Sequence, residues 1–293
     1  MISKHLYAYG HTLSFYSTRK QRECNTIYID CLHTLSLTQY THKIFFDTNQ
    51  GREIYLCSQY DLNEKQDKWA FVVEGCITFL CNTETKTICY KEEQNFSQEL
   101  MEYWLVHIVL PLFLTLENKH YFFHTGSVLV EDKAVLFMGD SYAGKSTLTD
   151  FFLQKGHALL SDDKLASFYD EQSEAFFVHA SHPYHRPYRA REDLGQKAEN
   201  FKEGRFSIGK IYWLEPVAAE KEVSIKELKG RKKFECLRYS TEMDIALYKR
   251  ERFEYLSKFA NSMKIYEVQV PHDMKRLGEV YEKIVEDIKK EER

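Results

Sequence analysis

The chain has 293 residues, of which 43% are hydrophobic and 15% are aromatic. This length predicts about two domains, and the hydrophobic fraction excludes wholesale disorder. Basic side chains number 40 and acidic ones 44, so the formal net charge is −4. That balance gives no overall attraction to nucleic acid or to an anionic membrane. We therefore expect neither nucleic acid nor a membrane as a partner.

The N-terminal segment has no apolar core followed by small residues, so no signal peptide is predicted. The most apolar stretch, residues 104–116, is shorter than the ~20 residues that a membrane-spanning helix needs. Seven cysteines occur without a C-x-x-C pair, which argues against a disulfide scaffold and a zinc site. These features predict a cytoplasmic protein with reduced thiols.

Residues 1–93 carry short apolar runs separated by polar turns, a pattern typical of an antiparallel sheet of hairpins. The region contains no chemical motif, so we interpret it as a β-rich N-terminal domain. The expected strands are His5–Tyr9, Thr26–Ile29, Lys43–Phe46, Glu53–Cys57, Trp69–Val73, Cys76–Cys81 and Thr87–Tyr90.

A helix is predicted within residues 94–118. Asn95 and Gln98 have capping-box spacing, and apolar residues occupy most faces up to Leu116. A helix so uniformly apolar is typical of one buried between two layers, and Pro111 is expected to kink it. We interpret this helix as a bridge to a second domain over residues 119–293.

From His120 onward, strands alternate with helices, which predicts an α/β domain and an α+β chain overall. A helix is expected over Thr147–Lys155, and two helices finish the chain. The expected strands are Gly126–Val130, Ala134–Met138, Ala158–Ser161, Ala175–His179, Lys210–Leu214 and Lys264–Val270.

The residues between the strand that ends at Met138 and the following helix match the phosphate-binding motif G-x-x-x-x-G-K-[ST]. They are Gly139, Asp140, Ser141, Tyr142, Ala143, Gly144, Lys145 and Ser146. Backbone N–H groups of such a loop and the positive end of the helix hold phosphates, and Thr147 begins that helix. Lys145 suits the β- and γ-phosphates, and the Ser146 hydroxyl suits Mg²⁺. ATP and Mg²⁺ are therefore the predicted ligands. The GTPase motif N-K-x-D and the transport-ATPase signature L-S-G-G-Q are both absent from the sequence.

Two adjacent carboxylates, Asp162 and Asp163, end the next expected strand, 17 and 18 positions after Lys145. That strand would deliver them to the same sheet edge as the loop. Phosphoryl transfer needs one anion to orient or deprotonate the attacking hydroxyl and another to hold the metal. His124 is a candidate to bind phosphate or to pair with Asp163. A simple Asp-Asp turn and a structural histidine are the alternatives.

Residues 182–191 carry three arginines and two histidines among aromatic residues. Guanidinium groups bind phosphate or carboxylate in a bidentate manner, so Arg186 and Arg189 are candidate substrate ligands. The alternative is a solvated basic loop. The basic run at residues 229–233 is more typical of an ordinary surface than of a site for an acidic substrate.

Three segments together resemble the HPr kinase/phosphorylase family: residues 124–127 (H-T-G-S), residues 134–146 with the loop, and residues 156–163 (G-H-A-L-L-S-D-D). A weaker likeness to shorter HPr-kinase-like serine kinases extends to the end of the chain. The resemblance implies a P-loop kinase domain of the HPr kinase/phosphoenolpyruvate carboxykinase type that phosphorylates a serine hydroxyl. It implies Asp163 as the catalytic base, Lys145 as a charge stabiliser, Asp162 beside Ser146 at the metal and His124 as an active-site group.

Two features depart from that family. Tyr142 stands where the family usually has glycine, and the E-x-R-G-L-G-I-type segment that supplies its second metal ligand is missing. Glu192 and Asp193 are the acidic residues nearest to that place. These departures argue against reverse phosphorolysis and against HPr itself as the substrate.

We expect an ATP-dependent kinase that acts on a serine hydroxyl of a peptide or protein. Two alternatives stay open: a kinase for a small alcohol such as free serine, and a catalytically inactive nucleotide-binding regulatory protein. The sequence is also compatible with a homo-oligomer.

Overall fold

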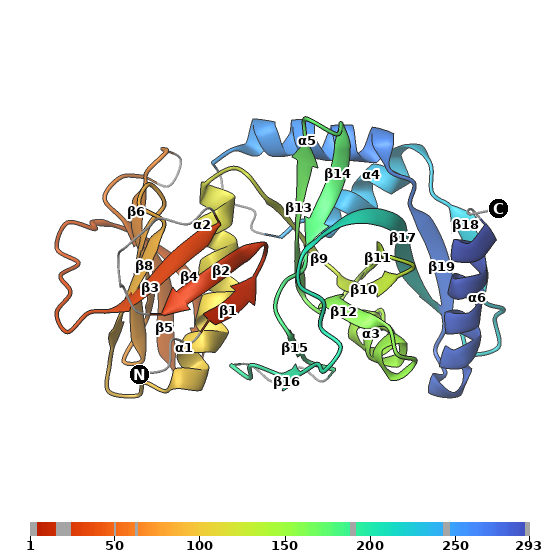
Figure 1. Ribbon diagram of the computed structural model, residues 1–293, viewed down its shortest axis with the longest axis horizontal. Coiled ribbons are helices and arrows are strands. Elements are labelled where there is room, and N and C mark those ends of the chain that lie inside the picture. Colours follow the sequence, from red (N-terminus) through yellow and green to blue (C-terminus); the bar gives the residue numbers. More distant parts are fainter. Residues whose placement is uncertain are drawn as a thin grey trace. The chain divides into compact units, whose positions relative to one another are not determined.

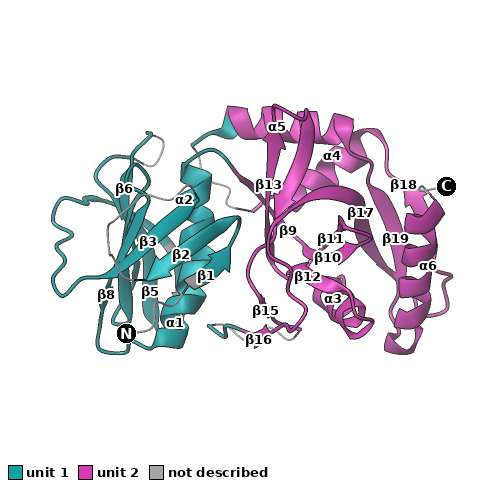
Figure 2. Cartoon of the chain, in the orientation of Figure 1, with its two compact units in different colours: residues 1–119, 191–194, 243–249 teal, residues 120–190, 195–242, 250–293 magenta. Residues whose placement is uncertain are grey.

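The computed structural model describes residues 5–15, 25–49, 51–61, 64–187, 192–242 and 247–290. The chain divides into two compact units (Figure 2). Unit 1 contains residues 1–119, 191–194 and 243–249, and unit 2 contains residues 120–190, 195–242 and 250–293. The helix interpreted from the sequence as a bridge lies in unit 1.

Unit 1 is built on an eight-stranded sheet in the order β1-β2-β3-β8-β7-β6-β5-β4 (Figure 1). Each of the expected runs overlaps an observed strand, whereas β2 was not expected. The strands are β1 His5–Ala8, β2 His11–Phe15, β3 Thr26–Cys31, β4 His42–Asn49, β5 Arg52–Ser58, β6 Lys68–Val73, β7 Ile77–Asn82 and β8 Thr87–Glu92.

The expectation of a purely antiparallel sheet in unit 1 is wrong. Strand β3 pairs in parallel with both β2 and β8. Side chains alternate between the two faces with the same period in parallel and antiparallel strands. The apolar pattern therefore predicts which face is buried and carries no information on strand direction.

The helix of unit 1 runs through α1 Gln98–Trp104, the π-helical turn η1 Leu105–Val109 and α2 Leu110–Leu116. Ser97 caps it, rather than Asn95, because the Ser97 side chain accepts from the backbone N–H of Leu100. Pro111 has no N–H to donate to the carbonyl four residues earlier. Immediately before it the helix widens, and the N–H of Leu110 bonds to the carbonyl of Leu105. A π-helical turn thus lies directly before Pro111, the residue at which a kink was expected.

In the described part of the chain, residues 98–116 form the one helix that is long and apolar enough to cross a membrane by length and composition. However, 72% of its most apolar segment is buried within the structure, and Phe113 and Leu114 are fully buried. The core helix of a β-sheet unit has the same properties, so the helix is weak evidence for a membrane span.

Unit 2 is built on a nine-stranded mixed sheet in the order β12-β10-β11-β17-β14-β13-β9, with β19 paired to β17 and β18 to β19 (Figure 1). The sequence predicted β10, β12 and β14 with their observed bounds and missed β9, β13 and β18. The strands are β9 Tyr121–His124, β10 Gly126–Val130, β11 Lys133–Gly139, β12 Ala158–Ser161, β13 Lys164–Asp170, β14 Ala175–His179, β17 Arg205–Val217, β18 Ile225–Glu227 and β19 Tyr266–Pro271. A separate two-stranded sheet pairs β15 Tyr184–His185 with β16 Gln196–Lys197.

The large sheet of unit 2 curls on itself. Strands β12 and β13 lie near opposite ends of the strand order, yet only Asp162 and Asp163 separate them in the chain. Because the three peptide links from Ser161 to Lys164 span at most about 11 Å, the two ends of the sheet must approach each other there. The acidic pair therefore lies where the sheet closes.

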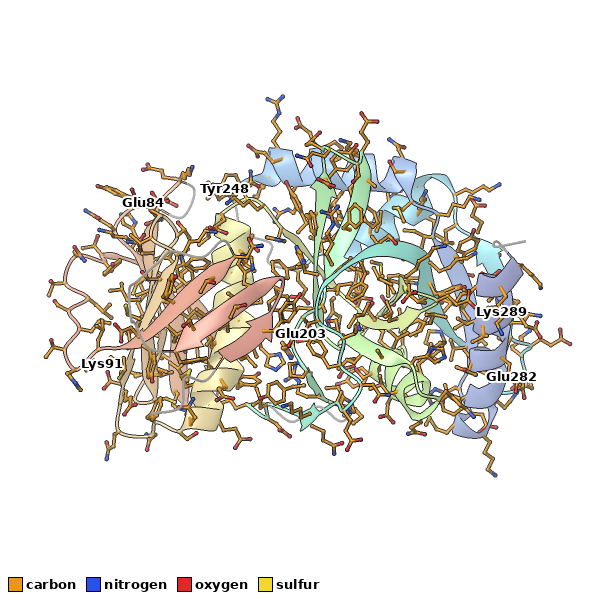
Figure 3. All side chains as sticks on the ribbon, viewed as in Figure 1. Glu84, Lys91, Glu203, Tyr248, Glu282 and Lys289 are labelled. Atoms are coloured by element: carbon orange, nitrogen blue, oxygen red, sulfur yellow. The ribbon has the colours of Figure 1, made fainter. Side chains whose placement is uncertain are left out.

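Within the part of the chain that the structure describes, four α-helices follow β11: α3 Lys145–Gln154, α4 Gly230–Tyr239, α5 Lys249–Ser262 and α6 Leu277–Lys290. Helices α3 and α6 pack around a core that includes Phe137 and Phe152. Helix α6 buries Ile284, while Glu282 and Lys289 are exposed (Figure 3). The last two helices of the chain are α5 and α6, and β19 and the 3₁₀ turn η2 (Met274–Arg276) lie between them. The mixed α/β character expected for the chain is confirmed.

Candidate functional site

The loop that joins β11 to α3 carries the G-x-x-x-x-G-K-S motif. β11 ends at Gly139, and α3 begins at Lys145. Gly139 has φ +154°, and a Cβ at that position would lie 2.9 Å from the carbonyl oxygen of Leu214. Gly144 precedes the helix in the left-handed region at φ +92°. The backbone therefore requires glycine at both motif positions.

Lys145 holds its ammonium group at this loop. The residue is 6% exposed, and its Nζ donates to the carbonyl oxygens of Gly139 at 2.8 Å and Asp140 at 2.9 Å. The first turn of α3 and a buried cation thus meet at the same loop, and both favour an anion there.

Tyr142 adopts a conformation that suits glycine better. Its φ is +67°, and the left-handed region costs a non-glycine residue about 1–2 kcal/mol. The side chain is 89% exposed, so burial does not compensate the strain. The backbone at this position therefore favours glycine over tyrosine.

Helix α3 packs directly on β10 through Gly126. A Cβ on Gly126 would lie 2.1 Å from the Oγ1 of Thr149, and Thr149 is fully buried in the second turn of α3. Glycine in the H-T-G-S segment is therefore a packing residue, because it lets the helix that carries Lys145 approach the sheet.

Asp162 is a buried carboxylate between β12 and β13. It is 8% exposed, and its Oδ2 accepts from the backbone N–H of Arg186 at 2.6 Å. Burial raises the pKa of Asp162 and the charge of Asp163 adds to this, whereas the Arg186 N–H and the Ser146 hydroxyl counteract the rise. Its Oδ1 is buried without a hydrogen-bond partner. A carboxylate in this condition favours a nearby cation.

Ser146 and Asp162 fit a Mg²⁺ ion better than a metal that needs a full protein cage. Mg²⁺ is usually bound by one or two protein oxygens together with water and substrate phosphates. The Ser146 hydroxyl lies near enough to Asp162 to stabilise its charge, and Asp162 offers an unpartnered oxygen. Among the described residues no group of three His, Cys, Asp or Glu side chains could hold a metal by itself.

Asp163 contacts an imidazole and two cationic side chains. The Nδ1 of His124 lies 3.0 Å from its Oδ1, and its Oδ2 lies 3.2 Å from the Nζ of Lys164 and 3.1 Å from the Nη2 of Arg186. Its side chain is 19% exposed, so it is partly accessible from solvent. These contacts orient the carboxylate and leave one part of it accessible to a substrate.

The strand register brings this cluster together. Strands β9 and β13 are antiparallel with Lys164 opposite His124, and the N–H of Thr125 donates to the carbonyl of Asp163 at 3.0 Å. Glu242 joins the cluster from a distant part of the chain. Its backbone N–H donates to the carbonyl of Phe122, and the Glu242 carboxylate lies 3.6 Å from the Nδ1 of His124.

Lys164 and Glu242 are two site residues that sequence reasoning missed. Lys164 is buried, and burial alone would lower its pKa, but the charges of Asp163 and Glu242 raise the pKa above the ordinary lysine value. A lysine directly after the Asp-Asp pair was the one available signal. No local sequence signal pointed to Glu242, because it lies 79 positions after Asp163 in the chain.

The basic segment 182–191 is only partly described. Arg186 is not a solvated residue, because its backbone and guanidinium groups bind Asp162 and Asp163 and its side chain is 18% exposed. Arg189 lies outside the described residues. The Glu192 carboxylate binds the Arg52 guanidinium at 2.6 Å and the indole N–H of Trp104 at 3.2 Å, all within unit 1.

The chain matches no protein-family model, and no curated protein is significantly similar to it in sequence. Among solved structures it is similar to the HPr(Ser) kinase/phosphatase from Coxiella burnetii, with a TM-score of 0.35 and 12% sequence identity. The similarity covers 58% of this chain and 98% of that chain.

Proposed function

We propose that the chain is an ATP-dependent kinase that transfers the γ-phosphoryl group to a serine hydroxyl of a peptide or protein. The observation that carries the proposal is that the motif loop and the acidic pair follow the carboxyl ends of β11 and β12, which both pair antiparallel with β10 and so end at the same edge of the sheet. A phosphate-binding loop beside two carboxylates with different surroundings is the arrangement that phosphoryl transfer needs.

Asp163 is the proposed base. It would orient the attacking hydroxyl and accept its proton while the new O–P bond forms at the γ-phosphorus. The bond from that phosphorus to the bridging oxygen of the β-phosphate breaks, and ADP leaves with the electron pair. The role of His124 is to hold the carboxylate through the 3.0 Å contact between its Nδ1 and Oδ1.

The cations of the site would stabilise the negative charge of the transferred group. Lys145 would exchange its bonds to the Gly139 and Asp140 carbonyls for the β- and γ-phosphates, next to the N–H groups that begin α3. Removal of one such preorganised donor typically lowers kcat by about 10²–10³-fold.

Ser146 and Asp162 would hold Mg²⁺ in this proposal. The ion, when bound, supplies positive charge to the oxygens of the β- and γ-phosphates. Asp162 is suited to this role because its Oδ1 is buried and its Oδ2 is fixed by the Arg186 N–H.

The test is incubation of the protein with Mg²⁺ and γ-labelled ATP in the presence of separate pools of serine-containing peptides and of small alcohols. Mass spectrometry then identifies the labelled product. We expect a phosphorylated peptide that is absent with Lys145→Ala. Labelled products found only in the small-alcohol pool would move the acceptor to that class. Nucleotide binding with no labelled product in either pool would contradict kinase activity.

A further inference from the structure

A cavity of about 190 Å³ opens beside the motif loop in unit 2. Its lining comes from four elements that are far apart in the sequence. They are the loop and first turns of α3, the ends of β17 and β19, and the first turn of α6. The lining residues used below are Tyr142, Thr147, Val270, Asp273, Met274 and Leu277.

This cavity lies at the carboxyl ends of parallel strands, where ligands of α/β proteins usually bind. Strands β11, β17 and β19 run parallel to one another, and the cavity is lined by residues at the carboxyl ends of β17 and β19 and after the end of β11. Ligands bind in α/β sheets outside the carboxyl ends of such strands. Because Tyr142, Ala143 and Gly144 line the cavity, it is continuous with the loop that would hold the phosphates.

The size and chemistry of the cavity indicate what it takes. Pockets for whole drug-sized ligands measure about 300–1,000 Å³, so this cavity suits one flat ring system rather than a whole nucleotide. Val270, Met274 and Leu277 give it an apolar wall, and Asp273 and Thr147 offer a few polar groups. Tyr142 is among the lining residues and is 89% exposed, and aromatic side chains can stack on any nucleobase.

We propose that this cavity binds the purine base of the nucleotide whose phosphates the motif loop holds, with Tyr142 stacked on the base. The inference rests on the proposed function, because it assumes that the loop binds a nucleotide. It also gives a role to a tyrosine that occupies a left-handed position.

The experiment compares two ligands that share phosphates and differ in the base: MgATP and magnesium tripolyphosphate. Calorimetric titration measures both dissociation constants for the wild type and for Leu277→Trp, which fills the cavity. The matched control is Val285→Trp, a partly buried position two turns further along α6 that does not line the cavity. Circular dichroism confirms that each variant is folded.

We expect Leu277→Trp to weaken ATP binding at least tenfold and to leave tripolyphosphate binding within twofold, whereas Val285→Trp changes neither. Tyr142→Ala should weaken ATP binding by about tenfold, since base stacking on an aromatic ring is typically of that order, and Tyr142→Phe should retain it. This second pair decides the question if Leu277→Trp does not fold.

Equal ATP affinity in the wild type, Leu277→Trp and Tyr142→Ala would overturn the assignment of the base, even if the loop binds phosphate. Wild-type ATP binding no tighter than tripolyphosphate binding would do the same. Failure of the proposed function gives a different result: a wild type that binds neither ligand, or a Lys145→Ala variant that binds both as well as the wild type.

Discussion

Replacing Gly126 with alanine should destabilise unit 2 through one identifiable contact. The added Cβ would lie 2.1 Å from the Oγ1 of Thr149, but 3.4 Å from the Cβ of Thr149 and from the carbonyl oxygen of Lys145. Only the first distance is a clash. Thr149 cannot turn away freely, because it is fully buried, its hydroxyl donates to Lys145 at 2.9 Å, and its β-branched side chain is restricted at χ1.

Overpacking of this kind costs about 1–3 kcal/mol, and each kcal/mol lowers the melting temperature by about 2–4 °C for a unit of this size. Thr149→Ala removes the clashing atom and one hydrogen bond worth about 1 kcal/mol. We therefore expect Gly126→Ala to be costly alone and nearly neutral in the Thr149→Ala background.

Thermal unfolding of the wild type, the two single variants and the double variant measures this coupling. The expected coupling free energy is about 1–3 kcal/mol in favour of the double variant. Additive losses in the double variant would refute the reasoning, because they would place the cost of the alanine somewhere other than at Thr149. The same result would remove the packing explanation for glycine in the H-T-G-S segment.

Three further outcomes follow from named residues. Tyr142→Gly should raise the free energy of unfolding by about 0.5–1 kcal/mol, because glycine relieves the cost of the left-handed backbone but adds conformational entropy to the unfolded chain. An unchanged melting temperature would argue against strain at this residue. Burial alone would raise the pKa of Glu267, but hydrogen bonds from Lys226 and Lys232 hold it below the usual value. The stability that the Glu267 carboxylate contributes is therefore complete above about pH 4.5 and is lost as the pH falls below that value. Acid should lower the melting temperature more steeply in the wild type than in Glu267→Gln. Melting temperatures that fall equally with pH in both proteins would contradict this. Glu242→Gln should lower kcat several-fold without changing the KM for ATP, because it alters the support of His124; steady-state kinetics with an unchanged kcat would remove Glu242 from that role.

The part of the site that the sequence predicts is the part made by residues close together in the chain. Gly139, Gly144 and Lys145 form one loop, and the conformation of that loop depends on its own backbone. The Asp162-Asp163 pair also follows a short apolar strand that ends beside the loop. Local chemistry is sufficient for these features, because no distant segment is needed to form them.

The remaining features depend on pairings that no local pattern contains. Strand β9 reads Y-F-F-H, an apolar run without alternation, and β13 starts directly after the acidic pair. Their register places Lys164 opposite His124, and Glu242 joins them next to an isolated bridge between Phe123 and Thr241. The parallel pairing of β3 was missed for a related reason, since apolar periodicity does not depend on strand direction.

The turnover of Asp163→Asn tests the central claim most directly. Asparagine keeps the shape of the side chain but cannot accept the hydroxyl proton as a carboxylate does. We expect kcat for phosphoryl transfer from labelled ATP to fall by about 10²–10⁴-fold, the usual contribution of a general base, with ATP affinity nearly unchanged. The matched control, Asp170→Asn at the far end of β13, should retain wild-type turnover. Wild-type turnover in Asp163→Asn would contradict the account.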